Sequence, residues 1–275
     1  MTDQYAVFGH PVEHSWSPFI HGLFAKQTGQ DLQYRKTDVP PAQLAQRVAE
    51  FFAQGGKGLN LTLPHKSAGL LLAQNIAARA ERAGAVNTLS WQQDAHHIMG
   101  DNTDGIGLVR DLTENIGLDL RDCRVLFCGA GGATRGALAP LLAQDLHEVV
   151  IANRNVARAQ ELAGTFGDLG SVQGCSYEDL TSEPAFDIVI NATSAGLSGE
   201  TPALPRACVR GDTVCYDMGY SKADTPFGRW ASAAGCRQIY KGWGMLVEQA
   251  AESFLLWRGV RPDTAPVLAV LSEQI

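Results

Sequence analysis

The pattern of hydrophobic and polar positions in the first hundred residues predicts mixed strands and helices. Short apolar or alternating runs predict strands at 5–8, 32–39 and 58–63. The pairs Ser17-Pro18 and Pro40-Pro41 are helix-start signals, and they predict helices at 17–26 and from 41 to the Gly55-Gly56 pair. Two helical pieces are expected across 68–82, followed by a hairpin of 85–91 with 96–99.

From about residue 105 the pattern becomes a regular alternation of strands and helices. Helices are predicted at 105–115, from 132, at 156–163 and at about 242–257, and strands at 124–128, 148–152, near 171, 186–190 and 213–216. In the last helix one apolar stripe is expected, formed by Met245, Leu246, Ala250, Phe254 and Trp257. Such alternation is typical of a parallel, doubly wound sheet with right-handed crossovers. We therefore predict a two-domain α/β protein with a boundary between residues 103 and 104.

Composition narrows the class of protein. The chain has 275 residues, is 45% hydrophobic and carries a net charge of −7, so it can bury a large core and is a poor candidate for binding nucleic acid or a membrane surface. It contains no apolar run of membrane-spanning length, and we expect no signal peptide, because Tyr5 already begins a strand. Six cysteines without a Cys-x-x-Cys pair, and no zinc-type spacing, favour free thiols in a reducing cytosol and no bound metal.

A glycine-rich stretch follows the predicted strand 124–128. Gly129, Gly131 and Gly132 lie between that strand and a helix, which is the arrangement that holds a dinucleotide pyrophosphate against free backbone N–H groups. Thr134 stands where the third glycine of the usual pattern would be, and Gly132 with Gly136 offers an alternative for close helix packing. The other interpretation is an ordinary tight turn between a strand and a helix.

The end of the next predicted strand indicates which dinucleotide is bound. An acidic residue there binds the ribose hydroxyl of NAD, whereas an arginine accommodates the ribose phosphate of NADP. This chain has Arg154 and Arg158, four residues apart at a helix start, and no acid at the strand end. The pattern favours NADP, although two solvated arginines would also give it.

Several polar residues are candidates for chemistry. Asn60 and Thr62 are expected on one face of a strand, with Lys66 just beyond it at a helix start; an ordinary surface lysine remains the simpler reading. Asp104 is equally well explained as a helix N-cap, and the segment 101–105 does not fit a calcium loop. The remaining candidates are paired hydroxyls, one of them a possible helix cap, and an amide on the apolar stripe: Ser15, Ser17 and Gln249.

Together these segments resemble the shikimate dehydrogenase family. The matching runs are 8–18, 60–66, 84–88, 100–105, 129–133, 153–154, 191–194, 216–220 and 242–246 with Gln249. The resemblance implies an N-terminal substrate domain (1–103) completed by the C-terminal segment 242–275, a Rossmann-like NADP domain (104–241), and a cleft between them. It also implies the reversible, NADP-dependent reduction of 3-dehydroshikimate to shikimate in aromatic amino acid biosynthesis, in the cytoplasm, by a monomer or homodimer.

The resemblance further implies roles for individual residues. Lys66 and Asp104 form the catalytic pair, with Lys66 as general acid. The residues implied to bind substrate are Ser15, Ser17, Thr62, Asn87, Tyr220 and Gln249. Those implied to bind the cofactor are Gly129, Ala130, Gly131, Gly132, Ala133, Asn153, Arg154, Arg158, Met218 and Gly242. Asn155 and Trp243 depart from the threonine and leucine that are usual in the family.

Two alternatives stay open at this point. One is a quinate/shikimate dehydrogenase that uses NAD, which the two arginines disfavour. The other is a sensor that kept both binding sites and lost catalysis, which the presence of both Lys66 and Asp104 disfavours.

Overall fold

The computed structural model describes residues 2–193, 195 and 199–274, which form two compact units. The first unit extends to Gly107 and resumes at Leu246; the second comprises Leu108–Met245. Each division falls inside a helix, α4 (Asp104–Arg110) or α8 (Trp243–Arg258), so both helices contribute residues to both units.

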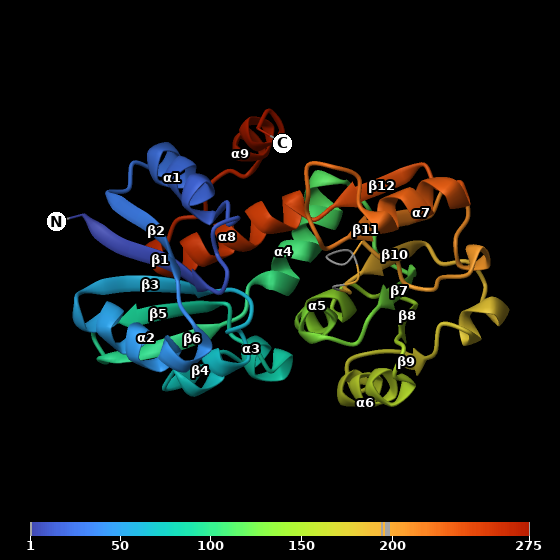
Figure 1. Cartoon of the computed structure of the whole chain (residues 1–275), viewed down its shortest axis with the longest axis horizontal. Helices are drawn as coiled ribbons and strands as arrows, with labels where there is room; N and C mark the ends of the chain where they lie inside the picture. Colours follow the sequence, from blue (N-terminus) through green and yellow to red (C-terminus); the bar gives the residue numbers. More distant parts are fainter. Residues whose placement is uncertain (1, 194, 196–198, 275) are drawn as a thin grey trace. The chain divides into compact units, whose positions relative to one another are not determined.

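The first unit is built on a mixed six-stranded sheet with the order β2-β1-β3-β5-β6-β4 (Figure 1). Its strands are β1 (Asp3–Gly9), β2 (Leu32–Asp38), β3 (Gly56–Leu61), β4 (Asn75–Ile76), β5 (Thr88–Gln92) and β6 (His97–Asp101). β1 pairs in parallel with β2 and β3, while β5 and β6 form the expected antiparallel hairpin. β3 begins and ends two residues earlier than the sequence pattern predicted, because Gly56 already pairs with Gln4 of β1.

Alternation along β1 places its side chains on two different helical layers. Tyr5 and Val7 pack with Val12 and Tyr34, on the side of α1 (Ser17–Thr28) and Trp257. Ala6 and Phe8 pack on the opposite face, in a core that includes buried residues of α2 (Leu44–Ala53). The short elements η1 (Pro41–Gln43), η2 (Ala68–Leu71) and α3 (Ala78–Ala83) complete this face and its connections.

The second unit contains the doubly wound sheet that the alternating pattern predicted. Its strands are β7 (Arg124–Cys128), β8 (Glu148–Ala152), β9 (Val172–Cys175), β10 (Ile188–Asn191), β11 (Val214–Asp217) and β12 (Gln238–Lys241). They lie in the order β12-β11-β10-β7-β8-β9, and all their ladders are parallel (Figure 1). This order matches the dinucleotide-binding arrangement 3-2-1-4-5-6, with the glycine-rich turn after the first strand.

Both faces of this sheet are covered by helices. Val125 and Phe127 of β7 belong to a core with α5 (Gly132–Leu142) and α6 (Val156–Phe166). Leu126 and Cys128 belong to the opposite core, which includes α7 (Pro226–Ala234) and the short helices η4 (Asp179–Ser182) and η6 (Arg206–Cys208). Because neither face meets water, the strands read as continuous apolar runs.

Some elements differ from the sequence prediction. The helix predicted at 105–115 is α4 followed by a π-helical turn at Asp111–Asn115. The sequence pattern did not reveal α7, β12 and α9 (Ala265–Ser272). β12 gives a weak signal because it is short and only half-buried. The buried face of α8 is wider than the single expected stripe: Ala250 and Phe254 are fully buried as expected, but so are Val247, Ala251 and even Glu248. Glu248 accepts hydrogen bonds from Arg261 and Thr264 at 2.7 and 2.6 Å, which compensates its burial.

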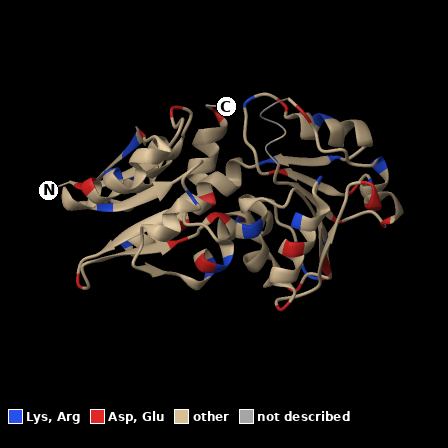
Figure 2. Cartoon of the chain, turned by 60° about the horizontal axis from the view of Figure 1, so that its bottom comes forward, with Lys and Arg blue, Asp and Glu red and all other residues tan. Residues whose placement is uncertain are grey.

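Charges of both signs are interspersed over the chain (Figure 2). No helix among the described residues is long and apolar enough to span a membrane. The six cysteines are free thiols, as expected for a chain without a disulfide framework.

Candidate active site

Lys66 and Asp104 form a direct ion pair in the first unit. Nζ of Lys66 donates to Oδ2 of Asp104 at 2.7 Å, and the two side chains are 30% and 12% exposed, so the pair is mostly shielded from solvent. Lys66 was expected at a helix start, but it lies in a turn, two residues before the short helix η2. The surface-lysine interpretation is wrong, because the ammonium group faces a mostly buried carboxylate.

Asp104 does not act as the N-cap of its helix. It is the first residue of α4, and its backbone N–H is bonded instead by the side chain of Asn102 at 3.1 Å. Its second carboxylate oxygen, Oδ1, accepts from Nδ2 of Asn87 at 2.8 Å. Both carboxylate oxygens are therefore held, one by an amide and one by the ammonium group of Lys66.

The orientation of the Asn87 amide is fixed by its other contacts. Its Oδ1 accepts from the backbone N–H of Thr103 at 2.9 Å and from the hydroxyl of Thr88 at 2.8 Å. A backbone N–H can only donate, so the oxygen of the amide must face Thr103 and the nitrogen must face Asp104.

A buried hydroxyl on α8 ties this group to the sheet. Oγ of Ser253, fully buried, lies 3.1 Å from Nδ2 of Asn60, 2.8 Å from the hydroxyl of Thr88 and 3.2 Å from that of Thr103. Sequence reasoning missed Ser253. A signal existed, because a serine four residues after Gln249 lies on the same helix face as the candidate amide.

Ser15 and Ser17 lie together at the start of α1. Their hydroxyls are 3.2 Å apart, and Oγ of Ser15 accepts the backbone N–H of Ser17 at 3.3 Å. Ser17 is not the N-cap that the sequence suggested: it is the first residue of the helix, and the capping position is Trp16. The buried Ser17 lies near the hydroxyl of Tyr34, which donates to Asn60 at 2.7 Å. The serine pair thus lies close to the cluster around Asn87, to which Asn60 belongs.

Three other candidates lie in different surroundings. Thr62 comes just after β3 ends rather than on a strand face shared with Asn60, and its N–H donates to Phe8 at 2.9 Å. Gln249 is half-buried; its nitrogen donates to the Leu246 carbonyl at 2.8 Å, and its oxygen is 3.5 Å from Nδ2 of Asn87. Tyr220 belongs to the second unit, where its ring lies 4.7 Å from that of Trp243 and burial raises the pKa of its hydroxyl.

The glycine-rich turn between β7 and α5 is open to solvent. Gly129 has a φ of +100°, which glycine adopts without strain, and the hydroxyl of Thr134 donates to its carbonyl at 2.6 Å. Thr134 thus fastens the turn where a third glycine was expected. A Cβ on Gly131 or Gly132 would meet nothing within 4 Å, so the proposed packing role of Gly132 is wrong, and this surface is free for a ligand. Ala130 and Ala133 complete the turn, half-buried and exposed respectively.

Arg154 and Arg158 are exposed at the start of α6, which begins at Val156. Neither guanidinium has an acidic partner among the described residues. Asn153 shapes the segment before them by donating to the carbonyl of Asn155 at 2.9 Å. Two unpaired cations beside an open glycine turn fit a dinucleotide that carries an extra phosphate.

Met218 and Gly242 lie at the ends of neighbouring strands. The N–H of Met218 donates to Asn191 at 2.9 Å, and Gly242 packs against the carbonyl of Met218, where a Cβ would not fit. Ser194, which closes one of the matching sequence runs, lies outside the described residues. Within the described part of the chain, no group of three or more His, Cys, Asp or Glu side chains is placed to hold a metal ion.

Comparison with protein families gives three matches along the chain. Residues 7–89 match the shikimate dehydrogenase substrate binding domain, 111–203 match shikimate / quinate 5-dehydrogenase, and 242–271 match the shikimate 5'-dehydrogenase C-terminal domain. A protein of Methylococcus capsulatus named shikimate dehydrogenase (NADP(+)) is 55% identical over 272 residues, covering 99% of this chain and 97% of that protein. The chain belongs to the shikimate dehydrogenase family.

Further relatives extend along the full length of this shikimate dehydrogenase family member. A protein of Alkalilimnicola ehrlichii with the same name is 55% identical over 274 residues, covering 100% of both chains. The crystal structure of an Ael1 enzyme from Pseudomonas putida matches with a TM-score of 0.93 at 45% identity, over 98% of each chain. The shikimate 5-dehydrogenase from Thermus thermophilus, solved in complex with NADP(H) and shikimate, matches with a TM-score of 0.86 at 32% identity, over 99% of this chain and 100% of that one.

Proposed function

We propose that this chain is an NADP-dependent oxidoreductase that reversibly reduces 3-dehydroshikimate to shikimate in aromatic amino acid biosynthesis. The observation that carries the proposal is the ion pair of Lys66 with Asp104, held by Asn87, in a family whose curated relatives bear that activity in their names. An ammonium group beside a fixed carboxylate is a positioned proton donor for a ring ketone.

In the reduction, bound NADPH supplies the hydride that reaches the carbonyl carbon. Lys66 donates a proton from Nζ to the carbonyl oxygen, which becomes the hydroxyl of shikimate, and takes that proton back in the reverse reaction. Before transfer, the ammonium group stabilises the negative charge that develops on this oxygen. Asp104 holds Nζ in place at 2.7 Å and offers its carboxylate to a substrate hydroxyl.

The remaining polar residues are proposed to bind and orient the substrate. Ser15 and Ser17 present two hydroxyls 3.2 Å apart, a spacing suited to the two oxygens of the substrate carboxylate. The ring hydroxyls are assigned to the residues around the ion pair and to one tyrosine of the second unit: Thr62, Asn87, Gln249 and Tyr220.

The cofactor is assigned to the second unit. The open turn Gly129–Ala133 and the N-terminus of α5 bind the pyrophosphate, and Arg154 and Arg158 bind the ribose phosphate that distinguishes NADP from NAD. Asn153, Met218 and Gly242 line the rest of the cofactor site. We accordingly assign 1–103 with 242–275 to the substrate domain and 104–241 to the NADP domain.

The two alternative functions are a quinate/shikimate dehydrogenase that uses NAD and a sensor that binds both ligands without turnover. A quinate/shikimate dehydrogenase using NAD is not favoured, because the relatives are named for NADP and the two arginines have no acidic partner in the described part of the chain. We place the enzyme in the cytoplasm, as a monomer or homodimer. Sedimentation of the purified protein distinguishes the monomer from the homodimer.

The test of the proposed function is reduced-nicotinamide absorbance with shikimate or quinate, each with NADP or NAD. Rapid reduction of NADP by shikimate, with slower rates in the other three combinations, is expected. Binding of shikimate without any turnover would support the sensor instead.

A further inference from the structure

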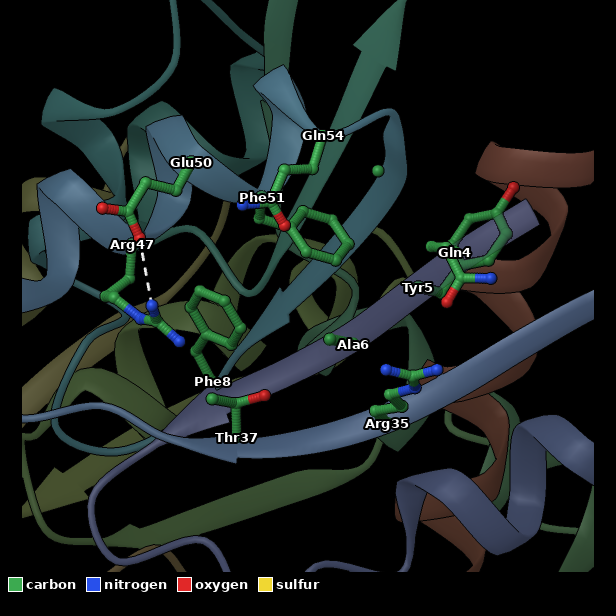
Figure 3. A pocket seen from close by; sticks show the side chains of 11 residues that line it. Gln4, Tyr5, Ala6, Phe8, Arg35, Thr37, Arg47, Glu50, Phe51 and Gln54 are labelled. Atoms are coloured by element: carbon green, nitrogen blue, oxygen red, sulfur yellow. Dashed lines mark hydrogen bonds and ion pairs between the residues drawn. The ribbon is translucent and has the colours of Figure 1, made fainter. Parts of the chain in front are cut away.

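The first unit contains a hollow of about 250 Å³ on the face of its sheet that α2 covers only in part. Figure 3 shows Arg35 and Thr37 extending from β2, with the Phe8 ring next to Thr37 and the Phe51 ring next to Gln54. The polar side chains at its rim are Gln4, Arg47, Glu50 and Gln54. None of these residues belongs to the proposed substrate or cofactor sites.

The hollow follows from the pattern of β2, the edge strand of the sheet. Arg35 and Thr37 alternate with Tyr34 and Lys36, and parallel pairing places Arg35 beside Ala6 and Thr37 beside Phe8. α2 packs over the apolar side chains of β1 and β3 but leaves the polar face of β2 uncovered. The result is a concave surface with an apolar floor and a charged rim.

The two phenylalanine rings of the hollow, Phe8 and Phe51, are held in place by each other and by the sheet under them. The rings of Phe8 and Phe51 meet edge to face, with centroids 5.9 Å apart and planes at 74°. A side chain at Gly56 would overlap the Phe51 ring, so the glycine lets this ring lie directly on the sheet. Phe8 is only 3% exposed, so the half-buried Phe51 is the ring that a flat hydrophobic group could contact here.

The charges of the hollow do not cancel. Arg47 pairs with Glu50 at 3.0 Å, which leaves the charge of Arg35 without a counterpart. Arg35 donates instead to the neutral side-chain amide of Gln33 at 2.5 Å, and no carboxylate pairs with it among the described residues. An unpaired guanidinium that lines the same hollow as the partly exposed Phe51 complements a carboxylate attached to a flat ring.

We propose that this hollow is a second ligand site, which binds a small aromatic carboxylate, with the carboxylate on Arg35 and the ring against Phe51. The site is separate from the serine pair, because Tyr34, whose hydroxyl lies near Ser17, is on the opposite face of β2 from Arg35. The inference goes beyond the proposed function and does not depend on it.

The test uses benzoate as the probe, added to the isotope-labelled full-length protein in the presence of saturating shikimate. Saturating shikimate fills the substrate site, which the proposed function assigns to the serine pair, so benzoate cannot act there as a simple substrate mimic. Backbone amide shifts then report where benzoate binds and with what affinity. Benzyl alcohol serves as the uncharged comparison, and Lys36→Gln is the matched control, because it removes a neighbouring charge from the other face of the same strand.

Benzoate is expected to shift amides of β2 and α2. Arg35→Gln should weaken binding by about tenfold or more, because a charge-assisted bond is lost, whereas Lys36→Gln should change it by less than about twofold. Phe51→Leu, which keeps an apolar side chain, should weaken binding without removing the preference for benzoate over benzyl alcohol. The proposal is overturned if benzoate produces no shifts there, if Arg35→Gln binds it as well as the unmodified protein, or if benzyl alcohol binds equally well.

Discussion

Nδ2 of Asn87 lies 2.8 Å from Oδ1 of Asp104, and the opposite end of the same amide is fixed by the backbone N–H of Thr103. The amide therefore holds the carboxylate in one orientation, with its other oxygen directed at Lys66. A proton donor positioned in this way does not need to be reorganised when the substrate arrives, and the following predictions start from it.

Replacing Lys66 by methionine should abolish most of the chemistry and little of the binding. Methionine keeps most of the side-chain volume but cannot donate a proton, so kcat should fall by roughly 10²–10⁴-fold. The dissociation constant for shikimate, measured by calorimetry, should change far less. A large loss of affinity with kcat retained at saturation would make Lys66 a binding residue instead.

Ser15→Ala should weaken shikimate binding without unfolding the protein. Ser15 is half-buried and its hydroxyl bonds only with Ser17 among the described residues, so its loss costs little stability. A hydrogen bond from this hydroxyl to the substrate carboxylate is worth about 1.5–3 kcal/mol, because the acceptor is charged. Titration with shikimate and a thermal melt of the same variant separate the two effects; unchanged affinity would place the carboxylate elsewhere.

Replacing Arg154 and Arg158 together by serine should raise the KM for NADP by about tenfold or more. The KM for NAD should remain nearly unchanged, because NAD lacks the ribose phosphate. Both side chains are exposed at the start of α6, so stability should not fall. Steady-state kinetics with both cofactors decide the matter: an equal loss for NADP and NAD would mean that the arginines have a structural role.

Gly244→Ala should destabilise the second unit. A Cβ at Gly244 would overlap the carboxylate of Asp111, which accepts a hydrogen bond from the buried hydroxyl of Tyr216 at 2.6 Å. We expect a loss of about 1–3 kcal/mol, as is usual for overpacking a buried site. The control is Gly164→Ala in α6, where a Cβ would meet nothing within 4 Å and helix propensity favours alanine by about 1 kcal/mol. Denaturant unfolding should therefore show opposite signs for the two variants.

His21 should make the first unit sensitive to acid. Its ring is buried, stacks on Tyr34 at 4.2 Å, and both ring nitrogens lack a hydrogen-bond partner, so burial lowers its pKa to about 3 from an ordinary value of 6.5. Between these two pH values His21 is protonated in the unfolded chain but neutral in the folded chain. The contribution of neutral His21 to the free energy of unfolding is thus fully present above pH 6.5 and is lost progressively as the pH falls toward 3.

For this histidine the loss between pH 7 and pH 5 amounts to about 2 kcal/mol. His21→Phe keeps the aromatic stacking but cannot titrate, so its unfolding free energy should fall less over the same interval. The exposed His147, changed to glutamine, serves as the control and should behave like the unmodified protein. Equal pH dependence of the His21 variant and the unmodified protein would contradict this prediction.

The strands and helices were predicted best where the two faces of an element are alike. β7, β8 and the turn at Gly129 have the bounds that their apolar runs indicated, because a strand buried on both faces reads as apolar along its whole length. The edge strand β12 was not predicted, and the buried face of α8 is wider than the predicted stripe. A half-buried strand shows no clear period, and the polar Glu248 was buried only because Arg261 lies beside it.

The sequence by itself determined the α/β class, the glycine turn, the paired arginines at the start of α6 and the family resemblance, since each depends on residues close together in the chain. Only the tertiary structure decided that Lys66 meets Asp104, that Asn87 fixes the carboxylate, and that Ser253 of α8 joins the cluster. These contacts join residues 17 to 165 positions apart. Local pattern carries no information about such pairs, because their distance is set by how the sheet and α8 pack.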